Sequence, residues 1–127
     1  MSLRIVICDD EAHITRAVSL KLSKAGYQVE ALPNGQAAWE AIQRETPALV
    51  ITDQQMPLLD GVGLCRRIRA NEATADLPLV MLTAKGYELA DDPELQKLNL
   101  EALIVKPFSP RGLLLVVEGI LTTSASH

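Results

Sequence analysis

Polar side chains that suit phosphoryl chemistry follow four apolar runs of the sequence, at the point where each run ends. The runs and the side chains that follow them are residues 3–8 with Asp9 and Asp10, 48–52 with Asp53, 79–82 with Thr83, and 102–105 with Lys106. A carboxylate at the end of a buried strand is costly unless it has a partner or a function. Three carboxylates, a hydroxyl and an ammonium group are the set that a metal-dependent phosphoryl site requires.

Each of these residue types has a distinct chemical role in such a site. Crowded carboxylates repel one another, and a hard cation such as Mg²⁺ with oxygen ligands relieves that repulsion. Asp53 could then act as a nucleophile and form an aspartyl-phosphate. Lys106 supplies a point charge for a phosphoryl oxygen, and the Thr83 hydroxyl can donate a hydrogen bond to another. Taken singly, the Asp9-Asp10 pair could instead cap a helix, and Thr83 could be a turn residue.

The apolar runs are short and β-branched, which predicts buried strands. A fifth strand is expected over residues 28–32, where the alternation of apolar and polar residues suits the edge of a sheet.

Helical periodicity lies between the strands. The expected helices span residues 11–25, 35–45, 62–70, about 93–98 and 110 to about 121. Gly26 is expected to end the first helix, and Asn34 and Asp92 to cap the second and fourth. Residues 86–91 are expected to form a loop, because Pro93 would interrupt a helix that ran through them.

Strand and helix alternate along the whole chain, which predicts an α/β fold with a doubly wound, five-stranded parallel sheet. Ligands of such sheets bind beyond the carboxyl ends of the strands, where the strand order reverses. We expect one domain over residues 1–121, followed by a flexible tail or linker stub over residues 122–127.

Composition narrows the class of protein. The chain has 127 residues, 48% of them hydrophobic, and a net charge of −4, as expected for one compact acidic domain. The basic cluster at residues 66–69 is interpreted as the solvated side and end of a helix, so direct nucleic-acid binding is not expected. Cys8 and Cys65 are interpreted as buried apolar residues. With neither a signal peptide nor a membrane-spanning run, the sequence predicts a cytoplasmic protein that does not bind membranes.

In combination, the motifs resemble those of response-regulator receiver domains over essentially the full chain. The matching residues are Asp9-Asp10-Glu11, Asp53 with Met56-Pro57 and Gly61, Leu82-Thr83-Ala84, and Lys106-Pro107-Phe108. The resemblance implies a flavodoxin-like fold with strand order 2-1-3-4-5 and five helices. It also implies a phosphorylation-dependent switch in two-component signalling.

The resemblance assigns a role to each residue of the site. Asp53 would accept a phosphoryl group from a sensor histidine kinase or a histidine phosphotransfer protein. Asp10, Asp53 and the backbone carbonyl of Gln55 would bind Mg²⁺ directly, and Asp9 mainly through water. Thr83 and Lys106 would contact the phosphoryl group. The domain would phosphorylate and dephosphorylate itself without being a turnover enzyme, and would act on a downstream protein target or a fused output domain.

One departure from the family pattern, at Leu103, and two further features of the sequence lead to additional expectations. Leu103 occupies a position that is usually aromatic, so we expect an altered response on the face formed by the fourth helix, the fifth strand and the last helix. Gln55 and Lys85 flank the site and are expected to tune the lifetime of the phosphoryl group. Leu114 and Leu115 widen the apolar side of the last helix, which suits tighter packing or a phosphorylation-dependent homodimer.

Two alternative functions remain open at this level. A receiver-like interaction module would bind partners without phosphorylation. An aspartyl-phosphate hydrolase would typically carry a second carboxylate two residues after the nucleophile, where this chain has Gln55.

Overall fold

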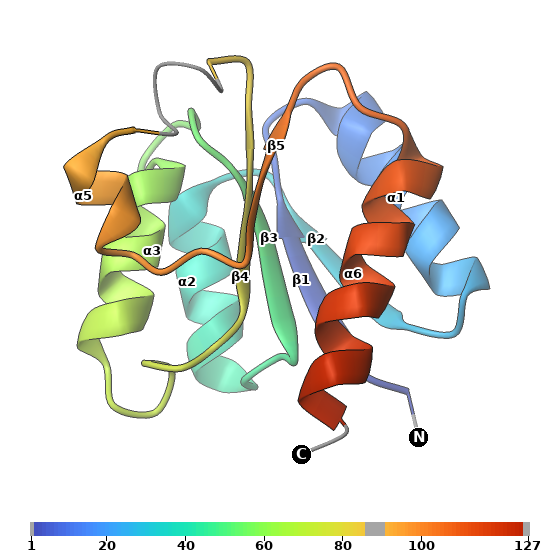
Figure 1. Ribbon diagram of the computed structural model, residues 1–127, viewed down its shortest axis with the longest axis horizontal. Helices are drawn as coiled ribbons and strands as arrows, with labels where there is room; N and C mark the ends of the chain where they lie inside the picture. Colours follow the sequence, from blue (N-terminus) through green and yellow to red (C-terminus); the bar gives the residue numbers. More distant parts are fainter. Residues whose placement is uncertain (1, 86–90, 126–127) are drawn as a thin grey trace.

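A five-stranded parallel sheet forms the centre of the molecule (Figure 1). The computed structural model describes residues 2–85 and 91–125. The strands lie in the order β2-β1-β3-β4-β5, and all four pairings are parallel. Their bounds are β1 Arg4–Cys8, β2 Gln28–Leu32, β3 Leu49–Asp53, β4 Leu79–Thr83 and β5 Ala102–Val105. The predicted strand order and the edge position of β2 are confirmed.

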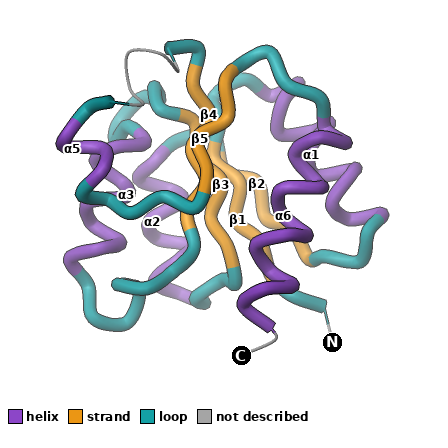
Figure 2. Tube along the Cα trace, viewed as in Figure 1, coloured by secondary structure: helices purple, strands orange, loops and turns teal. Residues whose placement is uncertain are grey.

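Helices cover both faces of the sheet, as a doubly wound fold requires. The helices of the described residues are α1 Ala12–Lys24, α2 Gly35–Arg44, α3 Gly61–Ala70, α5 Pro93–Gln96 and α6 Pro110–Ala125. Figures 1 and 2 show α1 and α6 on one face, and α2, α3 and α5 on the other. The predicted loop over residues 86–91 lies outside the described residues, apart from its last position.

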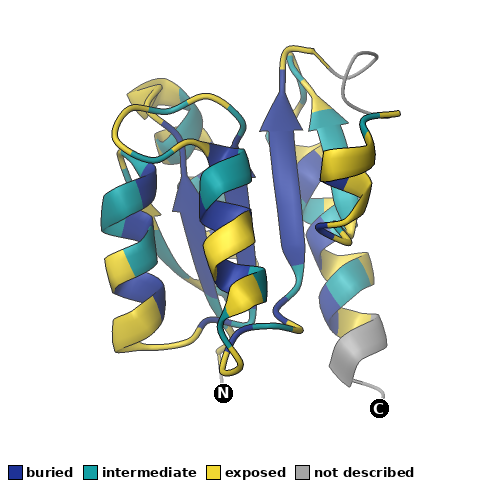
Figure 3. Ribbon diagram, turned by 90° about the vertical axis from the view of Figure 1, so that its left-hand side faces the viewer, coloured by how far each residue is buried: buried dark blue, intermediate teal, exposed yellow. Residues whose placement is uncertain are grey.

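Two apolar clusters hold these layers together, one on each face of the sheet. Alternate strand residues belong to different clusters: Val6 packs with α2 and α3, whereas Ile5 and Ile7 pack with α1 and α6. Every residue of β3 and β4 is buried, and Figure 3 shows the central strands enclosed between helices whose outer sides are exposed. Burial on both faces explains why these strands read as continuous apolar runs.

The predicted helix ends are confirmed where capping residues were identified. The Asn34 side chain accepts a hydrogen bond of 2.8 Å from the backbone N–H of Ala37 at the start of α2. Asp92 accepts one of 2.9 Å from Glu94 at the start of α5. Gly26 follows α1 with a φ of 103°, a conformation that glycine adopts without steric cost.

Two helix ends differ from the prediction. α6 continues to Ala125, so the expected tail over residues 122–127 is helical through that residue. Neither glycine nor proline occurs at residues 122–125, which leaves no local signal to stop the helix. α5 ends at Gln96 rather than near Leu98, and the chain turns at Asn99, whose φ is 55°.

Arg69 at the end of α3 contributes to the structure in a way that the sequence analysis did not foresee. Its guanidinium donates hydrogen bonds to the carbonyl oxygens of Ala75 (3.0 Å) and Leu77 (2.7 Å) before β4. It also donates to those of Leu98 (2.7 Å) and Asn99 (3.3 Å) before β5. One side chain therefore joins α3 to the two loops that lead into the last two strands.

We expect Arg69→Ala to lower the free energy of unfolding by about 2–3 kcal/mol, because hydrogen bonds from a charged group are the stronger ones. Urea denaturation followed by circular dichroism measures this change. Arg66→Ala is the matched control, since it removes only an exposed ion pair with Glu94 at 3.3 Å, and should cost less than about 1 kcal/mol. Equal losses in the two variants would contradict a structural role for Arg69.

Candidate functional site

The carboxyl ends of four strands bring the predicted site residues to one edge of the sheet (Figure 1). Asp53 and Thr83 are the last residues of β3 and β4, and Asp9 and Lys106 directly follow β1 and β5. The ladder aligns Asp53 with Leu82, so the ends of β3 and β4 lie at the same level. Parallel pairing therefore gathers side chains that are far apart in the sequence.

The Lys106 ammonium group lies at the centre of the site. Its Nζ is 3.1 Å from Oδ2 of Asp9, 3.2 Å from Oδ1 of Asp53 and 3.0 Å from Oε1 of Glu11. The lysine side chain is only 14% exposed and both aspartates are buried, so these three charges interact with little screening by solvent, whereas Glu11 is half exposed. Lys106 thus compensates several carboxylates at once.

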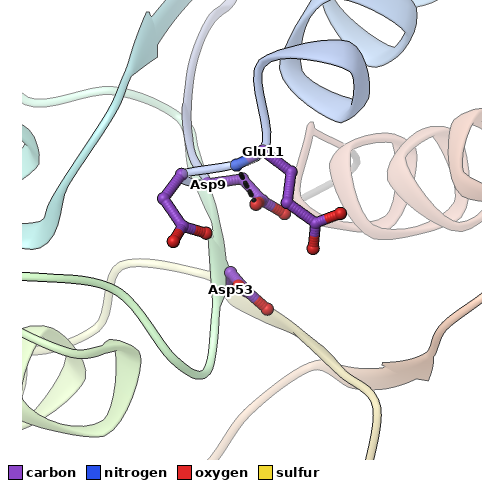
Figure 4. Close-up of side chains that lie close together, drawn as sticks. Asp9, Glu11 and Asp53 are labelled. Carbon is purple, nitrogen blue, oxygen red and sulfur yellow. Dashed lines mark hydrogen bonds between the residues drawn. The ribbon is translucent and has the colours of Figure 1, made fainter.

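Asp9 is held on both of its carboxylate oxygens. Its side chain is fully buried; Oδ2 contacts Lys106, and Oδ1 accepts a hydrogen bond of 2.9 Å from the backbone N–H of Glu11 (Figure 4). Figure 4 also shows the side chains of Asp9, Glu11 and Asp53 directed into the same space. Glu11 was expected only as part of the acidic motif, whereas in the structure its carboxylate forms an ion pair with Lys106.

The electrostatic balance differs between Asp53 and Lys106. Burial, and then the negative charge of Asp9, raise the pKa of Asp53 above its usual value, although Lys106 opposes the shift. Burial alone would lower the pKa of Lys106, but its hydrogen bonds to Glu11 and Asp9 and the nearby carboxylate charges raise it. Lys106 therefore stays charged. The negative charge of ionised Asp53 is only partly offset by Lys106, so the ionised form of this carboxyl is disfavoured.

A cluster of carboxylates in this site has the composition of a hard-cation site. One oxygen each from Asp9, Asp10, Glu11 and Asp53 lie within 4.8 Å of one another. A cavity of about 250 Å³ opens beside them, and its lining includes Asp10, Asp53 and Gln55. The residues predicted to bind Mg²⁺ therefore meet at one place, and oxygen donors of this kind suit that ion.

Thr83 makes a contact that the sequence analysis missed. Its hydroxyl donates a hydrogen bond of 2.7 Å to Oε1 of Gln54 and accepts one of 2.9 Å from the backbone N–H of Lys85. Thr83 is fully buried, and Gln54 lines the same cavity as Asp53. The sequence did offer a signal for this contact: Gln54 directly follows Asp53, and an amide side chain there can reach Thr83 at the end of the neighbouring strand β4.

Gly61 fixes the path of the chain between Asp53 and α3. Its backbone N–H donates a hydrogen bond of 2.8 Å to the carbonyl of Gln54, and the Asp60 side chain caps α3 by accepting one of 2.7 Å from Gly63. A Cβ atom at Gly61 would collide with the carbonyl oxygen of Asp53. The loop can therefore return close to the site only with glycine at this position.

The other residues singled out by the sequence do not belong to the carboxylate cluster. Leu103 is half-buried against the cluster beneath α2 and α3, and its effect on switching remains a prediction. On α6, Leu114 packs against the opposite cluster, whereas Leu115 is 62% exposed. Cys8 and Cys65 are buried free thiols, as predicted.

The fold and the site define a class of protein: a doubly wound parallel sheet with an acidic pocket and a central lysine at the carboxyl ends of its strands. The sequence model of the response regulator receiver domain family matches residues 5–118. The chain belongs to this family, and to its flavodoxin-like fold. It is thus the receiver domain of a two-component response regulator.

Curated relatives and solved structures agree with this assignment. The chain is 40% identical to the phosphate regulon transcriptional regulatory protein PhoB of Pseudomonas aeruginosa over 119 residues, which cover 92% of this chain and 51% of that protein. It is 37% identical to the probable transcriptional regulator ycf27 of Pyropia yezoensis, covering 93% and 47% of the two chains. The structure of the chemotaxis response regulator CheY4 of Vibrio cholerae matches with a TM-score of 0.86 and 26% identity over 94% and 99% of the two chains.

The chain spans about half the length of the curated relatives it matches. In the described part of the chain, no helix has the length and apolarity needed to cross a bilayer.

Proposed function

We propose that Asp53 accepts a phosphoryl group and that the domain works as a phosphorylation-dependent switch. The observation that carries this proposal is the position of Lys106, whose ammonium group joins Asp53 to Asp9 at 3.2 and 3.1 Å. A cation held there can neutralise charge on a phosphoryl group attached to Asp53. Because the group ends on a side chain of the protein itself, the domain is an acceptor rather than a turnover enzyme.

The transfer requires a donor with an activated phosphoryl group. A carboxylate oxygen of Asp53 forms a bond to phosphorus while the bond from phosphorus to the donor breaks, and the electron pair of that bond leaves with the donor. With a phosphohistidine, the pair returns to the imidazole nitrogen. A sensor histidine kinase or a histidine phosphotransfer protein is therefore the proposed partner.

Asp10, Asp53 and the carbonyl of Gln55 are the proposed ligands of Mg²⁺, with Asp9 acting mainly through water. Both oxygens of Asp9 are already engaged, which supports an indirect role for it. When bound, the cation would reduce the repulsion between Asp53 and an incoming phosphoryl group. Lys106 and the Thr83 hydroxyl would then hold the phosphoryl oxygens.

Phosphorylation can switch the domain only if the phosphoryl group binds two conformations unequally. Thr83 and Lys106 provide that difference. To contact a phosphoryl oxygen, Thr83 must give up its hydrogen bond to Gln54, and Lys106 must give up one of its carboxylate contacts. The proposed response reaches the surface around α5, β5 and α6, where a target protein, an output domain or a second copy of the chain would bind. The exposed Leu115 on α6 suits such a surface.

Incubation with acetyl phosphate tests the proposal directly. With Mg²⁺ present, the intact mass should rise by one phosphoryl group, and an excess of EDTA should prevent the gain. A folded protein that gains no mass with Mg²⁺ would instead favour an interaction module that works without phosphorylation. Rapid release of phosphate without accumulation of the phosphorylated protein would favour a hydrolase.

A further inference from the structure

We propose that Gln54 is a positioning residue that holds Thr83 in the unphosphorylated state, by accepting the only proton that the Thr83 hydroxyl can donate. The inference rests on the proposed function, because it concerns how Thr83 becomes available to a phosphoryl group on Asp53. It predicts that Gln54 sets how readily the domain switches.

The hydrogen bonds of Thr83 determine which group donates to which. Its hydroxyl accepts from the backbone N–H of Lys85 at 2.9 Å, so a lone pair is engaged there and the proton remains for another partner. That partner is Oε1 of Gln54 at 2.7 Å. If the Gln54 amide were flipped, its NH₂ group would face the Thr83 hydroxyl. The hydroxyl would then accept two hydrogen bonds, and neither of these two partners could accept its proton. The observed orientation of the amide is the favourable one, because it gives the fully buried Thr83 hydroxyl both a donor and an acceptor.

Two hydrogen bonds anchor the backbone of Gln54 beside Thr83. Its N–H donates to the carbonyl of Leu82 at 2.9 Å, and its own carbonyl accepts from Gly61 at 2.8 Å. Gln54 is thus tied both to β4 and to the start of α3. When Thr83 donates its single proton to a phosphoryl oxygen on Asp53, its hydrogen bond to Gln54 must break.

A phosphoryl oxygen and Oε1 of Gln54 consequently compete for one proton. The net free energy of such a hydrogen bond is about 1 kcal/mol, which corresponds to about a fivefold change in an equilibrium constant. Removing the amide should favour the phosphorylated conformation by about that factor. A shorter or apolar side chain at this position removes the competitor without touching Asp53 or Lys106.

The experiment is a thermodynamic cycle with beryllofluoride as the phosphoryl mimic, in the presence of Mg²⁺. Its apparent affinity is measured by amide NMR for wild type, Gln54→Leu, Thr83→Val and the double variant. Gln54→Leu should raise the affinity about fivefold when Thr83 is present and less than about twofold when Val replaces it. Gln54→Asn, whose amide is one methylene shorter, should behave like Gln54→Leu, whereas a distant Gln43→Leu change should have no effect.

The outcomes separate the inference from the proposed function. If Gln54→Leu changes the affinity equally in both backgrounds, or in neither, the hydroxyl is not involved and the inference is wrong, although the switch stands. If wild type binds no beryllofluoride through Asp53, the proposed function fails and the inference fails with it. Only an effect that depends on the Thr83 hydroxyl supports the inference.

Discussion

Asp53→Asn should abolish the gain of a phosphoryl group from acetyl phosphate and should also make the unphosphorylated protein more stable in Mg²⁺-free buffer. The loss follows because an amide cannot replace a carboxylate as the acceptor. The gain in stability follows because burial and the charge of Asp9 raise the pKa of Asp53, so its ionised form is disfavoured in the folded protein.

The pH dependence of this stability difference has a definite sign. The folded-state pKa of Asp53 lies above the unfolded value of about 3.9, so ionisation destabilises the native protein as the pH rises through the folded value. The advantage of Asp53→Asn should be absent at lower pH and fully developed at neutral pH. Urea denaturation of both proteins at several pH values measures it.

Mg²⁺ should reverse the order of stability. At a concentration 100 times its Kd, the ion would stabilise wild type by about 2.7 kcal/mol, and the variant, with one ligand removed, by less. Asp60→Asn is the matched control, since asparagine caps α3 as well as aspartate does. That control should accept the phosphoryl group normally. Phosphorylation of Asp53→Asn to the wild-type level would show that another residue is the acceptor.

Lys106→Met should lower the free energy of unfolding by about 3 kcal/mol in Mg²⁺-free buffer, because it leaves buried carboxylates without their cation. Asp9 loses its contact at 3.1 Å and Asp53 its contact at 3.2 Å, while the methylene stem of the side chain is largely retained. Adding Mg²⁺ should restore more stability to this variant than it adds to wild type, because the excess negative charge favours the ion.

Lys85→Met provides the control for the loss of one positive charge beside the same cavity. Lys85 is exposed, and its side chain should contribute little to stability. The raised pKa of Lys106 means that its stabilisation is complete below the unfolded value of about 10.4 and is lost at higher pH. The difference between wild type and Lys106→Met should therefore stay constant from neutral pH up to that value. Equal stability of the two methionine variants at neutral pH would contradict the central role of Lys106.

Local features of the sequence were sufficient to predict most of the fold. Strands β3 and β4 are buried on both faces, so their sequences are continuous apolar runs that end in a polar residue. Asn34 and Asp92 satisfy backbone N–H groups within their own helices, and such contacts depend only on nearby residues. The end of α6 was missed because no capping or breaking residue marks it.

The residue types of the site were also visible in the sequence, but their contacts were not. Asp9, Asp53 and Lys106 could be placed at strand ends because parallel strands present those ends at one edge. The same reasoning could not show that Arg69 leaves the solvated side of α3 to bind loop carbonyls, since its partners are set by how the loops pack.

By itself, the sequence determined which segments become strands and helices, and which polar groups end them, because hydrophobic periodicity and capping act over a few residues. Only the tertiary structure decided that Lys106 contacts Glu11 as well as the two aspartates, and that Gln54 holds Thr83. These contacts depend on the register of β3 against β4 and on the path of loops between distant segments. The partners of these side chains depend on which distant segments pack together, and a pattern that extends over a few residues does not specify that.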